Sequence, residues 1–268
     1  MGASFLTPLH EVLRVLDRGP GQTLVTTLGV LFLACTACAG PPDYAAQREA
    51  LIREIENQVR QTRNELGTAR LDPAVVAALR SVPREEFVPL PLRAEAYGNH
   101  PLPIGEGQTI SQPYIVAVMS QLLALGPGAK VFELGTGSGY QAAILAAMGA
   151  EVYSVEIVPQ LAERARRTLE RLGYHGVHVR AGDGYLGWPE AAPFDGIIVT
   201  AAAERVPQPL IDQLVRGGRL VMPVGEHGWI QRLVVLHKTA TGAIERREVL
   251  PVRFVPITGP GVRQKGTD

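Results

Sequence analysis

The sequence has few of the features that mark disulfide, metal or nucleic-acid-binding proteins. Its 268 residues include only two cysteines, Cys35 and Cys38, so the chain beyond them has neither a disulfide framework nor a thiolate metal site. The six histidines are scattered without an H-E-x-x-H or comparable cluster, and no metal is indicated. Lys plus Arg and Asp plus Glu each total 26, and a net charge of zero does not favour nucleic acid as a partner.

The first 43 residues differ from the rest of the chain. Arg14 and Arg18 precede an uncharged run, residues 19–39, whose A-C-A end (37–39) resembles a signal-peptide cleavage site. One interpretation is a secretory or lipoprotein-type signal in residues 14–39. The alternative is a disordered or mis-annotated extension, because acidic residues interrupt the basic region before the run. The run is too short and too rich in threonine to indicate a transmembrane helix.

The chain up to residue 129 carries helical patterns around a loop. Apolar residues recur at helical spacing near its start, and Asp72 followed by Pro73 is typical of an N-cap and first helical position. Glycine and proline gather before the third pattern and predict a loop. The expected elements are helices at 44–66, 72–80 and 113–125 and a loop at 97–111.

From residue 130 the chain alternates between strand and helix patterns, which predicts a doubly wound, mostly parallel sheet with its ligand beyond the carboxyl ends of the strands. The expected strands are 130–134, 151–155, 178–181, 196–200 and 219–224, and the expected helices are 140–148, 159–172 and 208–215. Three further strand-like segments, 232–237, 247–250 and 252–257, have little helix between them. They predict an antiparallel edge.

The segment V-F-E-L-G-T-G-S-G (131–139) is central to this core. It predicts a strand, a tight turn and a helix start, and its glycines, Gly135, Gly137 and Gly139, let the backbone approach a ligand. Backbone N–H groups at a helix start suit a polar ligand. The G-x-G-x-G spacing differs from the G-x-G-x-x-G of dinucleotide sites, and the carboxylate of Glu133 suits an amine better than a pyrophosphate. The turn therefore favours S-adenosylmethionine over NAD.

Two more acidic residues follow the next two strands. Glu156 ends the second strand, where a carboxylate can accept hydrogen bonds from both hydroxyls of a ribose. Asp183, in A-G-D-G, can receive the amine of an adenine, and Gly182 lets the base approach. The alternatives are a surface carboxylate for Glu156 and an Asx turn for Asp183. As an ordered series, the three acids indicate a nucleoside-binding fold more strongly than any one alone.

The loop I-G-E-G-Q-T-I-S-Q-P-Y (104–114) precedes the helix that leads into the first strand, so it should lie near the strand ends. Its Ser111 allows two interpretations. The hydroxyl can cap the helix that starts at Pro113. It can instead hold a substrate carboxylate beside the methyl donor, with Thr109 and Gln112 as neighbours.

Seven blocks of the sequence resemble the protein-L-isoaspartate (D-aspartate) O-methyltransferase family. They are V-P-R-E-E-F-V (82–88), L-P-I-G-E-G-Q-T-I-S-Q-P-Y (102–114), V-F-E-L-G-T-G-S-G-Y-Q-A-A-I-L-A (131–146), A-G-D-G-Y-L-G-W (181–188), P-F-D-G-I-I-V-T-A-A (193–202), G-G-R-L-V-M-P-V-G (217–225) and V-R-F-V-P-I (252–257). The resemblance covers roughly residues 50–257. It implies a Rossmann-like class I methyltransferase fold with N-terminal helices and a C-terminal antiparallel edge.

The resemblance also implies roles for single residues. Ser111 is the expected catalytic residue, and the C-terminal block 252–257 helps form the substrate groove. The expected substrate-binding residues are Thr109, Ile110, Gln112, Val252 and Phe254. The expected cofactor-binding residues are Glu133, Gly135, Thr136, Gly137, Gly139, Glu156, Gly182 and Asp183. The expected division of the chain is an N-terminal extension (1–43), helices with the substrate loop (44–129) and an S-adenosylmethionine-binding core with C-terminal strands (130–268).

The implied activity is methylation of the free carboxylate of L-isoaspartyl and D-aspartyl residues in damaged proteins. This carboxylate is already ionised near neutral pH, so Ser111 would orient it and no strong base is needed. The alternatives are a methyltransferase for another small carboxylate or metabolite, an NAD-dependent oxidoreductase and a binding module without activity. A cytosolic donor favours the cytoplasm, with export or envelope anchoring through residues 14–39 as the alternative. A monomer is favoured over an oligomer.

Overall fold

The computed structural model describes residues 42–226 and 228–263. The expectations for the N-terminal extension therefore lie, except at Pro42 and Asp43, outside the described residues. Among the described residues, none of the helices combines the length and apolarity that crossing a bilayer requires. The expected division at residue 130 stays a prediction.

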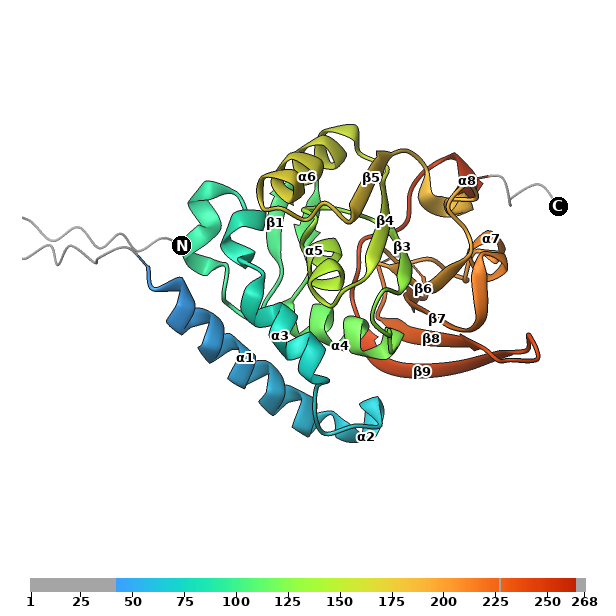
Figure 1. Ribbon diagram of the computed structural model, residues 1–268, viewed down its shortest axis with the longest axis horizontal. Helices are drawn as coiled ribbons and strands as arrows, with labels where there is room; N and C mark the ends of the chain where they lie inside the picture. The colour runs from blue at the N-terminus through green and yellow to red at the C-terminus, as the bar shows by residue number, and fades with distance from the viewer. Residues whose placement is uncertain (1–41, 227, 264–268) are drawn as a thin grey trace, which may run out of the picture. The chain divides into compact units, whose positions relative to one another are not determined.

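A seven-stranded sheet forms the centre of the fold (Figure 1). In spatial order its strands are β5 (Val177–Ala181), β4 (Glu151–Glu156), β3 (Lys130–Leu134), β6 (Phe194–Val199), β7 (Leu214–Val224), β8 (Gln231–Lys238) and β9 (Ile244–Val252). The strands from β5 to β7 pair in parallel, whereas β8 and β9 add antiparallel pairs. From β3 the chain first adds strands on one side (β4, β5) and then on the other (β6, β7). The switch point between β3 and β6 is the position at which such sheets bind ligands. The predicted doubly wound sheet with an antiparallel edge is confirmed.

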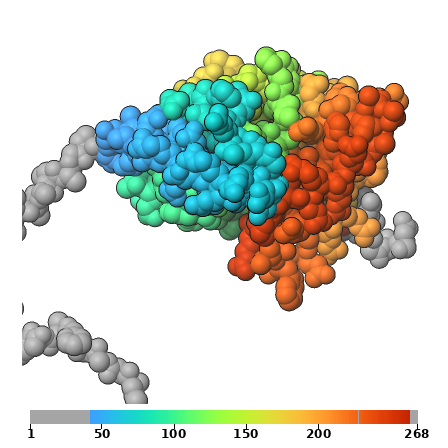
Figure 2. All heavy atoms as spheres, turned by 90° about the horizontal axis from the view of Figure 1, so that it is seen from below, coloured from blue at the N-terminus to red at the C-terminus, as the bar shows by residue number. Residues whose placement is uncertain are grey.

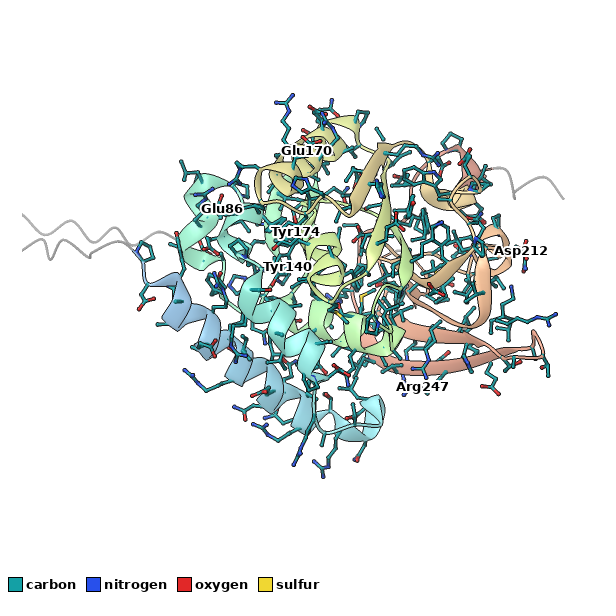
Figure 3. The ribbon with its side chains drawn as sticks, viewed as in Figure 1. Glu86, Tyr140, Glu170, Tyr174, Asp212 and Arg247 are labelled. Atoms are coloured by element: carbon teal, nitrogen blue, oxygen red, sulfur yellow. The ribbon has the colours of Figure 1, made fainter. Side chains whose placement is uncertain are left out.

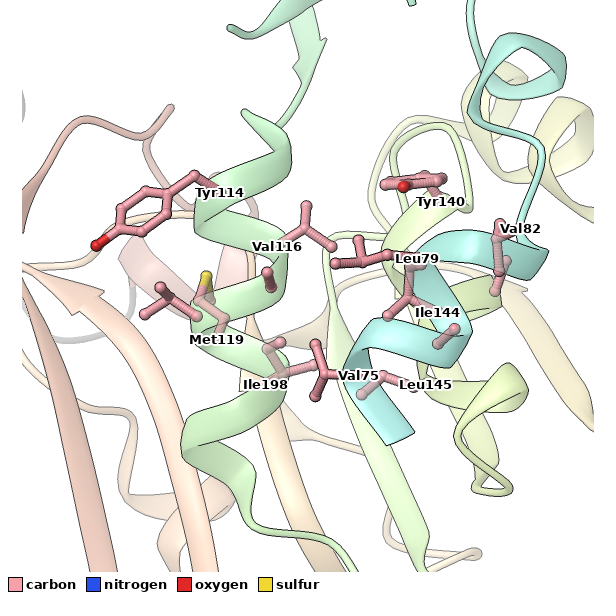
Figure 4. Close-up of a cluster of buried hydrophobic side chains, with 14 of the residues drawn as sticks. Val75, Leu79, Val82, Tyr114, Val116, Met119, Tyr140, Ile144, Leu145 and Ile198 are labelled. Carbon is pink, nitrogen blue, oxygen red and sulfur yellow. The ribbon is translucent and has the colours of Figure 1, made fainter. Parts of the chain in front are cut away.

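Side chains of the strands alternate between two hydrophobic clusters, one on each face of the sheet. Ile198 and Val221 belong to the first cluster, and their neighbours Ile197 and Leu220 belong to the second. The described helices are α1 (Tyr44–Gln61), α2 (Arg63–Leu66), α3 (Pro73–Ser81), α4 (Pro113–Leu123), α5 (Tyr140–Ala147), α6 (Pro159–Arg171), α7 (Gln208–Asp212) and α8 (Pro260–Arg263), and the 3-10 turns are η1 (Arg84–Phe87), η2 (Leu90–Glu95) and η3 (Gly184–Leu186). Figure 4 shows the first cluster, in which α3, α4 and α5 pack together.

The N-terminal helices form for the reasons that the sequence indicates. Asp72 caps α3, because its Oδ1 accepts a hydrogen bond from the N–H of Ala74 at 2.7 Å. In α1, one face buries Leu51, Ile52, Ile55 and Val59. Figure 2 shows the blue N-terminal helices beside the orange-red C-terminal strands, and α2 contacts β9 there. Residues far apart in the sequence thus share one core.

Three expectations about elements are wrong. The loop at 97–111 contains a hairpin, β1 (Leu102–Gly105) and β2 (Gln108–Ile110), whose tip residues adopt positive φ angles. The helix at 208–215 ends at Asp212, because Leu214 pairs with Phe194 of β6. The strand expected at 247–250 lies within the longer strand β9, whereas the segment expected as a strand at 252–257 leaves the sheet after Val252 and makes one isolated bridge, between Pro256 and Ala202.

The chain after β9 leaves the sheet ladder for a side-chain contact. The N–H of Phe254 donates to Oε1 of the buried Gln231 at 2.9 Å, and Pro256 has no N–H to offer. The chain then passes beside β6, where the N–H of Ile257 donates to the carbonyl of Ala202. This path carries 255–258 to the carboxyl ends of the strands.

Candidate functional site

The carboxyl ends of β3, β4 and β6 surround a pocket that we call the strand-end pocket. It is lined by 108–111, 134–138, 155–157 and 255–258, with single residues such as Tyr140 and Thr200. The predicted residues Ile110, Gly135, Thr136, Gly137 and Glu156 all line it. The hairpin β1–β2 and the segment after β9 close it from outside the sheet.

Glycine is required at the start of the turn. Gly135 has φ +97°, and a Cβ there would overlap Oγ1 of Thr200. That hydroxyl is fixed, because it donates to the carbonyls of Gly135 at 2.6 Å and Leu134 at 3.1 Å. The backbone of the turn therefore faces the pocket without an intervening side chain.

Glu156 lies at the pocket wall and is 5% exposed. Its Oε2 accepts a hydrogen bond from the N–H of Gly137 at 2.8 Å, and its Oε1 accepts one from Val158 at 3.0 Å. Each carboxylate oxygen has two lone pairs, so both retain capacity to accept a hydrogen bond from a ligand hydroxyl. The carboxylate thus stabilises the glycine turn from the next strand.

Glu133 lies beneath the turn and does not line the pocket. It is fully buried, and the hydroxyl of Ser154 donates to its Oε2 at 2.5 Å, while Oε1 has no hydrogen-bond partner among the described residues. Burial raises the pKa of Glu133 to about 8, and the nearby carboxylate of Glu156 adds to this shift, whereas the Ser154 hydrogen bond opposes it. A direct contact between Glu133 and an amine stays a prediction.

Three other predicted cofactor residues lie outside the pocket lining. Asp183 Oδ1 accepts from the N–H of Tyr185 at 2.9 Å, and its Oδ2 accepts from Gly261 of α8 at 2.7 Å. The carboxylate thus makes the turn contact that the sequence left open as an alternative. Gly139 is the N-cap residue of α5, where a Cβ would crowd Leu169 of α6. Gly182, beside Asp183, donates its N–H to the carbonyl of Glu156.

A second cavity, the side groove, adjoins the first. It is lined by 228–231 and 251–256, by Thr109, Ser111 and Gln112, and by a few flanking residues. The predicted residues Val252 and Phe254 belong to it. Ser111 lines both cavities, as do Thr109 and Thr200. Ser111 therefore lies in the wall that the strand-end pocket and the side groove share.

The capping role that the sequence allowed for Ser111 belongs to other residues. The N-cap residue of α4 is Gln112, and the N–H of Tyr114 in the first turn donates to Oδ1 of Asn99 at 3.1 Å. Nε2 of Gln112 also donates to the carbonyl of Asn99 at 3.0 Å. Asn99 therefore fixes the start of α4 from a distant loop.

Several lining residues were not predicted from the sequence. Thr200 could have been found from its position after the fourth parallel strand, at the same sheet edge as the three acids. Trp229 and Ile230, 72% and 59% exposed, line the side groove from the turn between β7 and β8. No local motif marks them. No group of three or more His, Cys, Asp or Glu side chains within 42–226 and 228–263 could hold a metal ion.

Comparisons with known proteins agree with the motifs. The model of the family Protein-L-isoaspartate(D-aspartate) O-methyltransferase (PCMT) matches residues 54–261. Protein-L-isoaspartate O-methyltransferase 2 of Syntrophobacter fumaroxidans is 53% identical over 244 residues, which cover 90% of this chain and 98% of the relative. The protein-L-isoaspartate O-methyltransferase of Gloeobacter violaceus is 63% identical over 185 residues, 69% of this chain and 90% of the relative.

Two solved structures share the fold. One is a protein-L-isoaspartate O-methyltransferase with a TM-score of 0.68 and 30% identity, covering 79% of this chain and 66% of that chain. The other is a putative protein-L-isoaspartate O-methyltransferase from Plasmodium falciparum in complex with S-adenosyl-L-homocysteine. It has a TM-score of 0.65 and 22% identity, and it covers 81% of this chain and 99% of that chain.

Proposed function

Because the chain belongs to the protein-L-isoaspartate (D-aspartate) O-methyltransferase family, we propose that it methylates damaged proteins. The reaction transfers a methyl group from S-adenosylmethionine to the free carboxylate of L-isoaspartyl and D-aspartyl residues. The observation that carries this proposal is the position of Ser111, which lines both the strand-end pocket and the side groove. A donor in one cavity and an acceptor in the other would meet at this residue.

The strand-end pocket has the chemistry of a site for the donor. Gly135 and Gly137 expose backbone, Thr136 lines the pocket beside them, and Glu156 presents carboxylate oxygens that suit ribose hydroxyls. The unpartnered buried Oε1 of Glu133 lies under the same turn. When bound, S-adenosylmethionine supplies an electrophilic methyl group on a positively charged sulfur.

The side groove would take the polypeptide acceptor. The acceptor carboxylate is ionised near neutral pH, so Ser111 acts by donating a hydrogen bond that orients one of its oxygens. Thr109 and Gln112 flank the position, and Phe254 provides apolar contact area for the substrate chain. Attack of the carboxylate on the sulfonium methyl neutralises two charges, so exclusion of water and correct alignment contribute most of the acceleration.

Methylation prepares the damaged residue for repair. In the methyl ester the backbone nitrogen of the following residue attacks the ester carbonyl and methanol leaves, which is a far better leaving group than the oxide of a free carboxylate, so the residue closes to a succinimide. Hydrolysis of this ring yields normal aspartate in part, and the remainder returns to the enzyme. The protein is accordingly a repair enzyme that acts on isoaspartyl-containing proteins and peptides. We place it in the cytoplasm, because its donor is made there, and propose that it acts as a monomer.

The test compares two synthetic peptides that differ only in one Asp or isoAsp linkage, with labelled S-adenosylmethionine as donor and the full-length chain as enzyme. We expect methyl ester on the isoAsp peptide alone, and at least tenfold less of it with Ser111→Ala. Equal labelling of both peptides would contradict the substrate assignment. Labelling of small carboxylates instead would favour a metabolite methyltransferase.

A further inference from the structure

Arg84 is the largest fully buried side chain of the described residues, and it lies behind the substrate loop. Its Nε donates to the carbonyl of Ala96 and its Nη2 to the carbonyl of Ser111, both at 2.8 Å. Its guanidinium carbon lies 4.7 Å from the ring centre of Tyr140. One side chain therefore joins the Ser111 loop to the first residue of α5, which lines the strand-end pocket.

The positive charge of Arg84 has no acidic partner. Within 42–226 and 228–263, no carboxylate oxygen lies within 4.0 Å of its guanidinium, and Nη1 has no hydrogen-bond partner at all. Other arginines nearby are paired: Arg93 and Arg171 bind Glu86, at 3.0 and 2.8 Å. Figure 3 labels Glu86, the partner of these two arginines, and Tyr140, whose ring lies beside the guanidinium of Arg84. Burying a cation without an acidic partner costs free energy. A fold tolerates this cost where the cation serves a ligand or a function.

The groups that face Arg84 do not neutralise it. Tyr140 from α5 and Tyr97 after η2 are its titratable neighbours, and burial raises the pKa of both phenols, so they stay uncharged. Glu85 on η1 is bound to the hydroxyl of Tyr97 and paired with Arg48. Burial lowers the pKa of Arg84 to about 10, which leaves the guanidinium charged at neutral pH.

The geometry points to Arg84 as a positioning residue that fixes Ser111 against the strand-end pocket and whose unpaired charge favours an anionic acceptor. This inference rests on the proposed function, since an acceptor carboxylate held at Ser111 would feel the positive charge of Arg84 through space without contacting it. Arginine suits this position because two separate nitrogens of a rigid planar group, Nε and Nη2, reach the carbonyls of Ala96 and Ser111, whereas a lysine has a single nitrogen on a flexible stem. Arg84 touches neither donor nor acceptor and acts through the main chain of Ser111.

Two substitutions separate the bridging from the charge. Arg84→Gln removes the charge, and we expect kcat/KM for the isoAsp peptide to fall at least thirtyfold while the affinity for S-adenosylhomocysteine changes less than threefold. Arg84→Lys keeps a positive charge at low pH, and its kcat/KM for the isoAsp peptide should be about fivefold below that of wild type there. Because burial lowers the pKa of a lysine, this deficit should widen as pH rises from 6.5 to 9, while wild type shows no such change. Arg80→Gln, which removes an exposed arginine paired with Glu49, is the matched control and should behave as wild type.

Several results would overturn the inference. One is a parallel loss of S-adenosylhomocysteine affinity in Arg84→Gln, which would mean a general structural role. Another is a deficit of Arg84→Lys that does not change with pH, which would exclude the charge. If Arg84→Gln does not fold, as judged by circular dichroism, the pH profile of Arg84→Lys still decides the matter. Failure of the wild-type chain to label the isoAsp peptide would instead overturn the proposed function.

Discussion

The strand-end pocket and the side groove differ in how they are built. The inner wall of the pocket comes from the glycine turn and the ends of neighbouring parallel strands, and its key carboxylate, Glu156, is almost fully buried. The groove is formed by side chains from segments far apart in the sequence, and two of them, Trp229 and Ile230, are largely exposed. A fixed small molecule needs a rigid site, whereas variable polypeptides need a tolerant one. Substitutions in the pocket should therefore cost more than substitutions in the groove.

The largest effect is expected at Glu156. Glu156→Ala should weaken S-adenosylhomocysteine binding about 100-fold, roughly 3 kcal/mol, because the carboxylate orders the N–H of Gly137 and would hold the ribose. Isothermal titration calorimetry measures this change. Glu151→Ala, at the exposed start of the same strand, is the control and should leave affinity unchanged. If Glu156→Ala weakens S-adenosylhomocysteine binding less than threefold, Glu156 does not bind the donor.

The next effect concerns the rigidity of the pocket. Gly135 and Gly149 both have positive φ, +97° and +91°, but only at Gly135 would a Cβ meet another atom, Oγ1 of Thr200. Both Ala substitutions incur the strain of the left-handed region, and Gly135→Ala adds overpacking. We expect Gly135→Ala to be less stable than Gly149→Ala by about 2 kcal/mol in urea unfolding. Equal losses would mean that Thr200 moves aside freely.

A smaller effect depends on pH and involves Glu133. Burial raises the pKa of its carboxyl from 4.5 to about 8, so the protonated form belongs to the folded state. This stabilisation is fully present below pH 4.5 and is lost as pH rises through about 8. Glu133→Gln stays neutral, so wild type should lose stability relative to it from pH 5 to pH 8. Parallel stability curves for the two proteins would show that Glu133 titrates normally.

The smallest effect is expected in the groove. Trp229→Ala removes an exposed ring from the wall of the side groove, and we expect KM for an isoAsp peptide to rise about threefold without a change in the urea midpoint. Steady-state methyl transfer measures KM, and S-adenosylhomocysteine affinity should stay constant. A rise in KM of about 100-fold, as large as the affinity loss expected for Glu156→Ala, would contradict the distinction between a rigid pocket and a tolerant groove.

The pocket could be predicted from sequence further than the groove could. Gly135, Gly137 and Glu156 follow consecutive strands, and parallel strands bring their carboxyl ends to one edge, so local patterns place them together. The same reasoning placed Asp183 there, although its carboxylate binds the N–H groups of Tyr185 and Gly261. Sequence could not reveal that contact, because Gly261 lies 78 positions away.

The groove depended on resemblance and on long-range contacts. Ser111 was recognised through the family motif, but its surroundings come from Arg84, Asn99 and the chain after β9, which no periodicity connects. Local patterns also missed the hairpin β1–β2, because its positive-φ tip resembles an irregular loop. Gln231, which binds the N–H of Phe254, is a buried polar residue at the start of β8, just before the strand expected at 232–237, and it carries no local signal of its partner.

The position of Ser111 has a consequence for which damaged proteins are repaired. A half-buried hydroxyl at the meeting point of two cavities can be reached only by a chain segment that extends away from its own fold. A damaged residue held in a helix or a sheet must first be released by local unfolding. For compact substrates, the rate of methylation should therefore follow the opening equilibrium of the damaged segment, as measured by hydrogen exchange. The most loosely held sites would be repaired first, whatever the age of the damage.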